Sequence, residues 1–157
     1  MGVSTDGIIC YGIALEDGCE LPWQDEKWDG DEEEWWMYEV CGYKNPFELF
    51  DEYGKWVPGM EREEEKHRQY YDQRREFKKA HPLPIEVVRH CSGEYMMYII
   101  AAPGTVRKAA RGYPEEINVD MFRPDSRGFN LVIDFCDEYG IDRNNEEPRW
   151  WLCSMWW

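Results

Sequence analysis

Cys91 and His90 are the residues whose types most readily suggest covalent chemistry, because they are adjacent and precede Ser92 and Gly93. A histidine can activate a cysteine thiol for acyl transfer. His90 ends a predicted strand and Cys91 follows it directly, however, and adjacent side chains on a strand point to opposite faces. We therefore predict no catalytic residues and interpret Cys91 as a structural thiol near a turn.

The histidines and cysteines are numerous enough to hold a metal, but their spacing matches no standard zinc site. His67, His81 and His90 are widely separated, and the six cysteines contain no Cys-x-x-Cys pair. The acidic residues from Asp29 to Glu34 lack the alternating oxygen ligands of a calcium loop, and no glycine stands at the position that such a loop requires. No glycine-rich phosphate-binding motif is present either. We expect no metal, no cofactor and no nucleotide hydrolysis.

The mixture of acidic and aromatic residues in segment 16–39 is the clearest functional signal. Residues 1–54 hold 15 acidic residues against two lysines, so they carry −13 of the total charge of −15. A disordered acidic tail contains few aromatic residues, so we expect an ordered acidic face. Such a face can imitate DNA phosphates and compete for the basic groove of a nucleic-acid-binding protein. The carboxylates assigned to it are Asp25, Glu26, Asp29, Asp31, Glu32, Glu33 and Glu34.

Tryptophans supply the predicted anchors of this binding surface, because tryptophan contributes strongly to interface energy. The anchors assigned are Trp23, Trp28, Trp35, Trp156 and Trp157. The alternative is that the tryptophans fill the core and the acids keep a small protein in solution. On a C-terminal strand, residues 150, 152, 154 and 156 would face one side and residues 151, 153, 155 and 157 the other. One of these sets could then form a docking or dimer surface.

The length of 157 residues is typical of one domain, which we assign to residues 1–157. No secretory signal or membrane-spanning segment is predicted, so we expect a cytoplasmic protein whose cysteines are reduced and mostly in the core. The bases from Arg74 to Lys79 end a predicted helix and suit its dipole. The net charge of −15 argues against direct binding of nucleic acid or membranes, and this small group of bases does not outweigh it.

The hydrophobic patterns predict an α+β fold. We expect strands over 7–15, 85–90, 95–102 and 150–156, and a further short strand within 106–113. Helices are predicted over 31–41, 61–79 and 125–139, and another begins at Asn45 and Pro46 and ends at Gly54. Because the strands are few and separated by helices, we expect a mostly antiparallel sheet of about four strands with helices packed on one face.

The whole chain resembles a family of small proteins encoded by bacteriophages and prophages, for which no biochemical activity is established. The segments that carry the resemblance are MGVSTDGIICYGI, EEWWMYEVCGYKNPFELFDEYG, HPLPIEVVRHCSGEYMMYIIAAPGT, RGYP and WWLCSMWW. The resemblance implies a phage gene product that acts in a bacterial cytoplasm as an accessory protein. It transfers no site residues to this chain.

Three functions follow from these observations. The leading hypothesis is an anti-defence inhibitor, of the anti-CRISPR or anti-restriction type, which blocks a basic host protein or nucleoprotein complex through its acidic face. The second is a small-molecule-binding protein or enzyme with an aromatic pocket near Cys91. The third is a structural or assembly protein that forms homodimers or larger oligomers through its C-terminal tryptophans.

Overall fold

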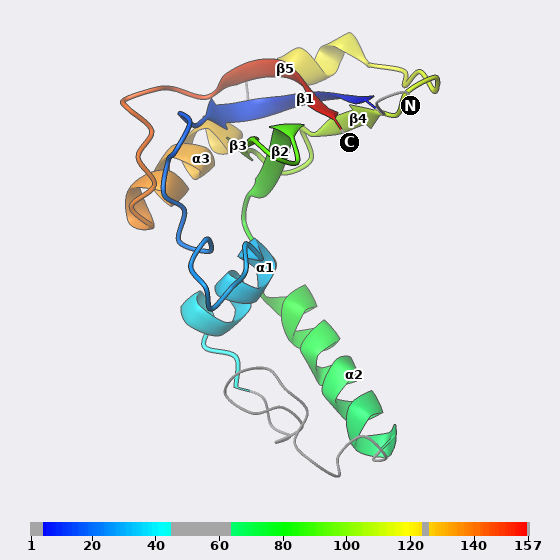
Figure 1. The fold of residues 1–157 in the computed structure, drawn as a ribbon, viewed down its shortest axis with the longest axis vertical. Helices are drawn as coiled ribbons and strands as arrows, with labels where there is room; N and C mark the ends of the chain where they lie inside the picture. The colour runs from blue at the N-terminus through cyan, green and yellow to red at the C-terminus, as the bar shows by residue number, and fades with distance from the viewer. Residues whose placement is uncertain (1–4, 45–63, 124–125, 157) are drawn as a thin grey trace. The chain divides into compact units, whose positions relative to one another are not determined.

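The computed structural model of the protein describes residues 5–44, 64–123 and 126–156, which form two compact units (Figure 1). The sheet unit comprises the described residues of 1–29 and 84–157, and the helical unit comprises those of 30–83. The assignment of one domain stays a prediction, because two compact units can belong to one domain. The helix predicted between Asn45 and Gly54 lies outside the described residues, as do Asp125 and Trp157.

Five strands form a single sheet in the sheet unit. They are β1 (Thr5–Ala14), β2 (Glu86–Ser92), β3 (Met96–Ala101), β4 (Arg107–Ala109) and β5 (Arg149–Trp156). Every pairing is antiparallel except that of β2 with β5, which is parallel. The predicted α+β fold with a mostly antiparallel sheet is therefore confirmed, with five strands in place of about four.

The strands close into a ring because β1 pairs with two different strands along one of its edges. Residues Gly7–Ile9 of β1 pair with β4, and residues Gly12–Ala14 pair with β3. β5 follows the other edge of β1. β3 also pairs with β2, and β2 meets β5 at Cys91 and Ser92, which completes the ring β1–β5–β2–β3.

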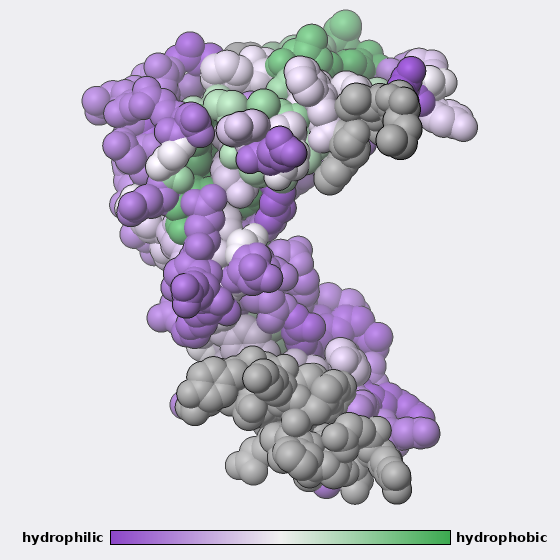
Figure 2. Space-filling model, viewed as in Figure 1, coloured by the Kyte–Doolittle hydropathy of each residue, from purple (hydrophilic) through white to green (hydrophobic). Residues whose placement is uncertain are grey.

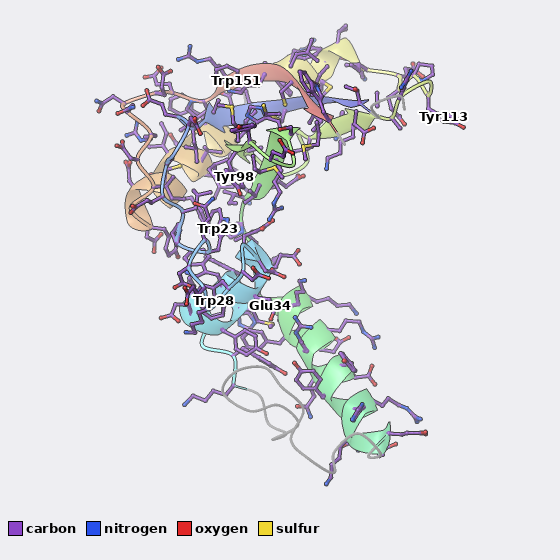
Figure 3. The ribbon with its side chains drawn as sticks, viewed as in Figure 1. Trp23, Trp28, Glu34, Tyr98, Tyr113 and Trp151 are labelled. Carbon is purple, nitrogen blue, oxygen red and sulfur yellow. The ribbon has the colours of Figure 1, made fainter. Side chains whose placement is uncertain are left out.

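The interior of the ring is apolar. Its buried residues are Ile8, Cys10, Val88, Ile99, Ala101 and Met155. Trp151 packs against this cluster from β5, and its indole Nε1 donates a 2.9 Å hydrogen bond to the carbonyl oxygen of Gly12 (Figure 3). A Cβ atom at Gly12 would lie 2.1 Å from the carbonyl oxygen of Ile100, so only glycine lets β1 approach β3 this closely.

Helix α3 (Ser126–Glu138) contacts β1. Its buried residues include Val132, Phe135 and Cys136, which are spaced as one helical face requires. On β1, Tyr11 and Ile13 alternate with the interior residues and are buried too, so this strand is covered on both faces. A short 3-10 helix, η3 (Val119–Phe122), precedes α3.

The helical unit contains α1 (Glu32–Trp35), a π-helical turn η1 (Trp36–Val40) and the long helix α2 (Glu64–Ala80). These elements confirm the helices predicted over 31–41 and 61–79, within the part of the chain that the structure describes. On α2, Tyr70 is buried, whereas the next residue, Tyr71, is 50% exposed. Successive residues of a helix point about 100° apart, so the two tyrosines cannot share one narrow face.

None of the helices in the described ranges is both long and apolar enough to cross a membrane. Figure 2 shows that hydrophilic residues dominate the visible surface of α2. Within the sheet unit, hydrophobic residues gather over η3, where Val119 is 77% exposed.

Candidate functional site

The predicted acidic residues of the sheet unit lie on an irregular but ordered segment. Asp25 stabilises a turn of this segment, because its carboxylate accepts hydrogen bonds from the backbone N–H groups of Lys27 and Trp28 at 2.9 and 3.2 Å. Asp25, Glu26 and Asp29 are all exposed. The predicted acidic carboxylates of this unit are thus presented to solvent on a backbone with defined turns.

A hollow of about 420 Å³ lies beside the start of this segment. Its acidic lining residues are Glu16, Asp17, Glu20 and Asp142. Asp142 was missed by the sequence analysis, because it follows α3 and nothing in its local sequence links it to the first acidic loop. The thiol of Cys19 donates a 3.6 Å hydrogen bond to the carbonyl oxygen of Asp142, which joins the two loops.

The acidic surroundings of this hollow also act on Cys19. Burial raises the pKa of the Cys19 thiol, and the nearby carboxylates of Asp142, Glu20 and Glu16 raise it further. A thiol with a raised pKa stays protonated and is a poor nucleophile. The hollow therefore suits cationic groups and does not suit thiolate chemistry.

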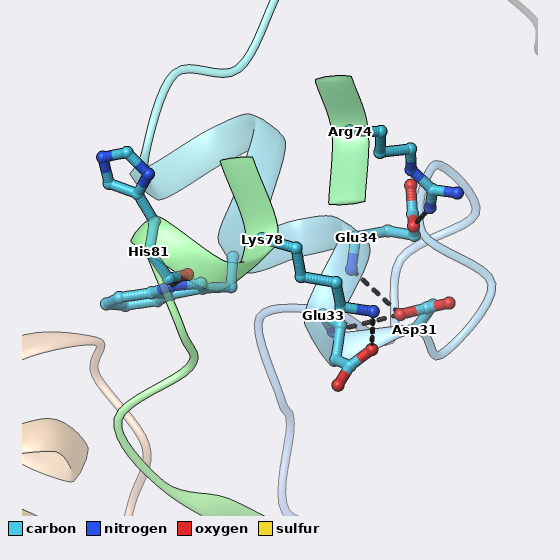
Figure 4. Close-up of polar contacts among 7 residues, drawn as sticks. Asp31, Glu33, Glu34, Arg74, Lys78 and His81 are labelled. Carbon is cyan, nitrogen blue, oxygen red and sulfur yellow. Dashed lines mark hydrogen bonds and ion pairs between the residues drawn. The ribbon is translucent and has the colours of Figure 1, made fainter. Parts of the chain in front are cut away.

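The acidic residues of the helical unit are organised by the start of α1. The Asp31 carboxylate caps this helix by accepting hydrogen bonds from the N–H groups of Glu33 and Glu34 at 3.0 and 2.9 Å (Figure 4). Glu32, Glu33 and Glu34 form the first turn, where the helix dipole stabilises negative charge. The sequence therefore favours a cluster of carboxylates at this position for local reasons.

Two of these carboxylates are neutralised within the helical unit. Glu34 forms an ion pair with Arg74, and Glu33 forms one with Lys78 of the same helix α2 (Figure 4). The bases of α2 were assigned to the helix dipole alone, and the structure adds this second role for Arg74 and Lys78. Glu33 and Glu34 were predicted as binding carboxylates, but they serve first as counterions of α2.

A second contact in the same region joins the π-helical turn to the end of α2. The Trp36 indole Nε1 donates a 3.1 Å hydrogen bond to the carbonyl oxygen of His81, and the His81 ring stacks on Phe77 with a 4.2 Å separation of ring centres. With the two ion pairs, this contact fixes α1 and η1 against α2. The carboxylates of α1 are therefore held in place by a packed pair of helical segments.

The seven predicted acidic residues are divided between the units. Asp25, Glu26 and Asp29 lie in the sheet unit, at the end of its N-terminal stretch 1–29. The four residues from Asp31 to Glu34 belong to the helical unit. Asp29 and Gly30 link them with positive φ angles of 49° and 78°, values that favour glycine and asparagine or aspartate. The continuity of a single acidic face stays a prediction.

The tryptophans predicted as anchors differ in their exposure to solvent. Trp23 is fully buried and Trp35 is only 5% exposed, so the prediction that they contact a partner is corrected: both side chains are core residues. Trp28 is half-buried beneath the Lys27 ammonium, which lies 4.2 Å from its ring centre. Trp156 is 52% exposed and keeps its predicted accessibility, whereas Trp157 lies outside the described residues.

Cys91 and His90 do not form a catalytic pair. Neither side chain hydrogen-bonds the other, and burial lowers the pKa of His90. The Nε2 atom of His90 is buried without a hydrogen-bond partner in the described chain. Cys91 adopts a φ of 78°, which marks the end of β2. All six cysteines are free, but only Cys10 and Cys136 are buried, so the prediction of mostly core thiols was wrong.

Comparisons with protein-family models, curated proteins and solved structures find no match to this chain.

Proposed function

We propose that the protein acts by binding a basic partner protein through the carboxylates of segments 16–29 and 31–34. Together these segments hold ten acidic residues against one lysine. The observation that carries the proposal is their ordered exposure: Asp25 and Asp31 accept backbone hydrogen bonds, so neighbouring carboxylates such as Glu26 are presented on defined turns. Ordered carboxylates attract and orient lysine and arginine side chains more effectively than a mobile tail does.

The acidic hollow gives this proposal a second support. Glu16, Asp17, Glu20 and Asp142 surround a space that a lysine or arginine side chain of a partner can enter. Carboxylates and backbone carbonyl groups are the acceptors that a guanidinium or ammonium group requires. The hollow belongs wholly to the sheet unit and does not depend on the placement of α1.

The form of the proposal that we favour is an anti-defence inhibitor that occupies a nucleic-acid-binding groove in the cytoplasm of a bacterial host. The charge of −15 and the resemblance to phage-encoded proteins support this form. A protein that replaces DNA on its target must compete with DNA, and its binding must weaken steeply with salt.

The test captures partners from a bacterial lysate on the immobilised protein at low salt and elutes them with duplex DNA. We expect a nucleic-acid-binding protein to be released by DNA and by raised salt. The informative variant is Glu16→Lys/Asp17→Lys/Glu26→Lys, because none of these carboxylates forms an ion pair with a described residue. Reversal of Glu33 and Glu34 is less clean, because it also breaks the ion pairs with α2.

The matched control is Glu115→Lys/Glu116→Lys/Glu138→Lys, which changes the net charge equally at exposed positions outside both segments. We expect the first triple variant to bind the captured protein at least about tenfold more weakly, and the control to retain most of its affinity. Equal losses in both variants would show that only net charge matters and would end the proposal of a defined surface. Binding that persists unchanged at high salt would end it too.

A second candidate function is self-association through β5. Leu152 is 79% exposed and Trp156 is 52% exposed, and both belong to the face of β5 that alternates with the interior residues. Sedimentation of the wild type against Leu152→Ser/Trp156→Ser decides it. Oligomers that disperse in the variant would support this function, and a wild type that stays monomeric at all concentrations would exclude it.

A further inference from the structure

A cavity of about 270 Å³ lies in the sheet unit, where β1, β5, η3 and the first turns of α3 meet. Its aromatic wall is formed by Tyr11 and Trp150, whose ring centres lie 5.4 Å apart at an interplanar angle of 52°. Met121 and Leu131 add aliphatic surface. Phe122 packs edge-on against Trp150 at 4.8 Å and fixes that wall from behind. This part of the cavity wall is therefore aromatic and aliphatic and suits the ring of a ligand.

The cavity has two charged residues among the described residues that line it, and both are basic. They are Arg123 and Arg127. This is unexpected by composition, because the chain holds 33 acidic residues against 18 basic ones. Arg123 pairs with Asp120 at 3.0 Å, but their side chains are 82% and 64% exposed, so this pair is weak and can exchange for another anion. The cavity thus has two guanidinium groups on its lining.

The polar atom of the Trp150 side chain is not exposed to the cavity. The Nε1 atom of Trp150 is buried and has no hydrogen-bond partner in the described chain. A buried donor without an acceptor is uncommon in proteins and costs free energy. Because this atom has no accessible surface, a ligand in the open cavity does not reach it, and Trp150 contributes only its ring to the wall.

We infer that this cavity binds a small aromatic carboxylate. The planar guanidinium groups of Arg123 and Arg127 match a carboxylate, and the Tyr11–Trp150 wall matches the ring. The volume of about 270 Å³ is just below the range typical of drug-sized ligands, so a nucleotide is too large, whereas one substituted ring or an indole fits. The site uses no residue of the acidic segments and stands independently of the proposed protein partner.

The test titrates phenylacetate, indole-3-acetate and 4-hydroxybenzoate into the isotopically labelled full chain and follows its indole N–H resonances by NMR. The Trp150 resonance is identified by its loss in Trp150→Phe. We expect it to shift on titration with at least one of these acids, because the ligand lies against this indole. Phenylacetamide, which lacks the charge of phenylacetate, should bind about tenfold more weakly or not at all.

Two double variants distinguish specific binding in the cavity from non-specific attraction of anions by the protein surface. Arg123→Gln/Arg127→Gln should weaken binding about tenfold or more, while Arg68→Gln/Arg75→Gln, which removes equal charge from α2, should leave it unchanged. Leu131→Phe keeps both arginines and should also weaken binding by narrowing the cavity. The inference is overturned if none of the three acids shifts the Trp150 resonance at about 10 mM, a concentration that detects even weak binding. It is equally overturned if the amide binds as well as the acid or if the two double variants behave alike.

Discussion

The Trp151 indole Nε1 donates a 2.9 Å hydrogen bond to the carbonyl oxygen of Gly12, from a position 139 residues further along the chain. This bond joins β5 to β1 at Gly12, the residue at which the pairing of β1 with β5 ends and its pairing with β3 begins. Trp151 also packs on the interior cluster of the strand ring. One side chain therefore both fills the interior of the sheet and joins β5 to β1.

Replacing Gly12 tests the closure of the ring. A Cβ atom in Gly12→Ala would lie 2.1 Å from the carbonyl oxygen of Ile100 and 2.7 Å from the Cα atom of Ala101, so the backbone must move. We expect the free energy of unfolding, measured in urea, to fall by about 1–3 kcal/mol or more. Gly7→Ala on the same strand is the control, because its nearest neighbour would be 4.0 Å away. Equal stability of the two variants would contradict this account of Gly12.

Removing the indole N–H of Trp151 tests the bond to Gly12. Trp151→Phe keeps an aromatic ring in the core but leaves the Gly12 carbonyl without this donor, so we expect a loss of about 1–3 kcal/mol in the free energy of unfolding. Trp156→Phe makes the same change at a 52% exposed residue and should change stability by less than about 0.5 kcal/mol. A Trp151 variant as stable as the wild type would show that water or another donor replaces the bond.

His90 should make the stability of the protein depend on pH. Burial lowers the pKa of His90 in the folded chain, whereas an unfolded histidine titrates near pH 6.5. As the pH falls below about 6.5, the unfolded chain binds the proton first, so the free energy of unfolding falls until the folded pKa is reached. His90→Gln should flatten this part of the profile in denaturant titrations. An unchanged slope in His90→Gln would assign the dependence to other groups.

The two ion pairs between α1 and α2 should differ in strength. The Glu34 and Arg74 side chains are 26% and 28% exposed, whereas Glu33 and Lys78 are 53% and 45% exposed. Water screens the second pair more, so double-mutant cycles should give a coupling of about 1 kcal/mol for Glu34–Arg74 and about 0.2–0.5 kcal/mol for Glu33–Lys78. Raised salt should reduce the second coupling more than the first. A stronger Glu33–Lys78 coupling would contradict the exposure argument.

The sequence determined the elements whose signals are local. Short apolar runs predicted four of the five strands closely, and acidic and basic ends predicted α2, because these patterns act over a few residues. The cap of α1 by Asp31 is likewise local, since donor and acceptor lie within three residues. The concentration of acids before residue 54 needs no structure at all.

Tertiary structure decided whatever depends on contacts between distant residues. The composition of residues 16–39 could not show that Trp23 and Trp35 are buried, because burial depends on what the fold places around them. The addition of Asp142 to the acidic hollow and the convergence of two arginines on the Tyr11–Trp150 wall also follow from chain segments more than 100 residues apart. A linear pattern records which side a residue faces along its own element, but only the packing of elements selects its neighbours.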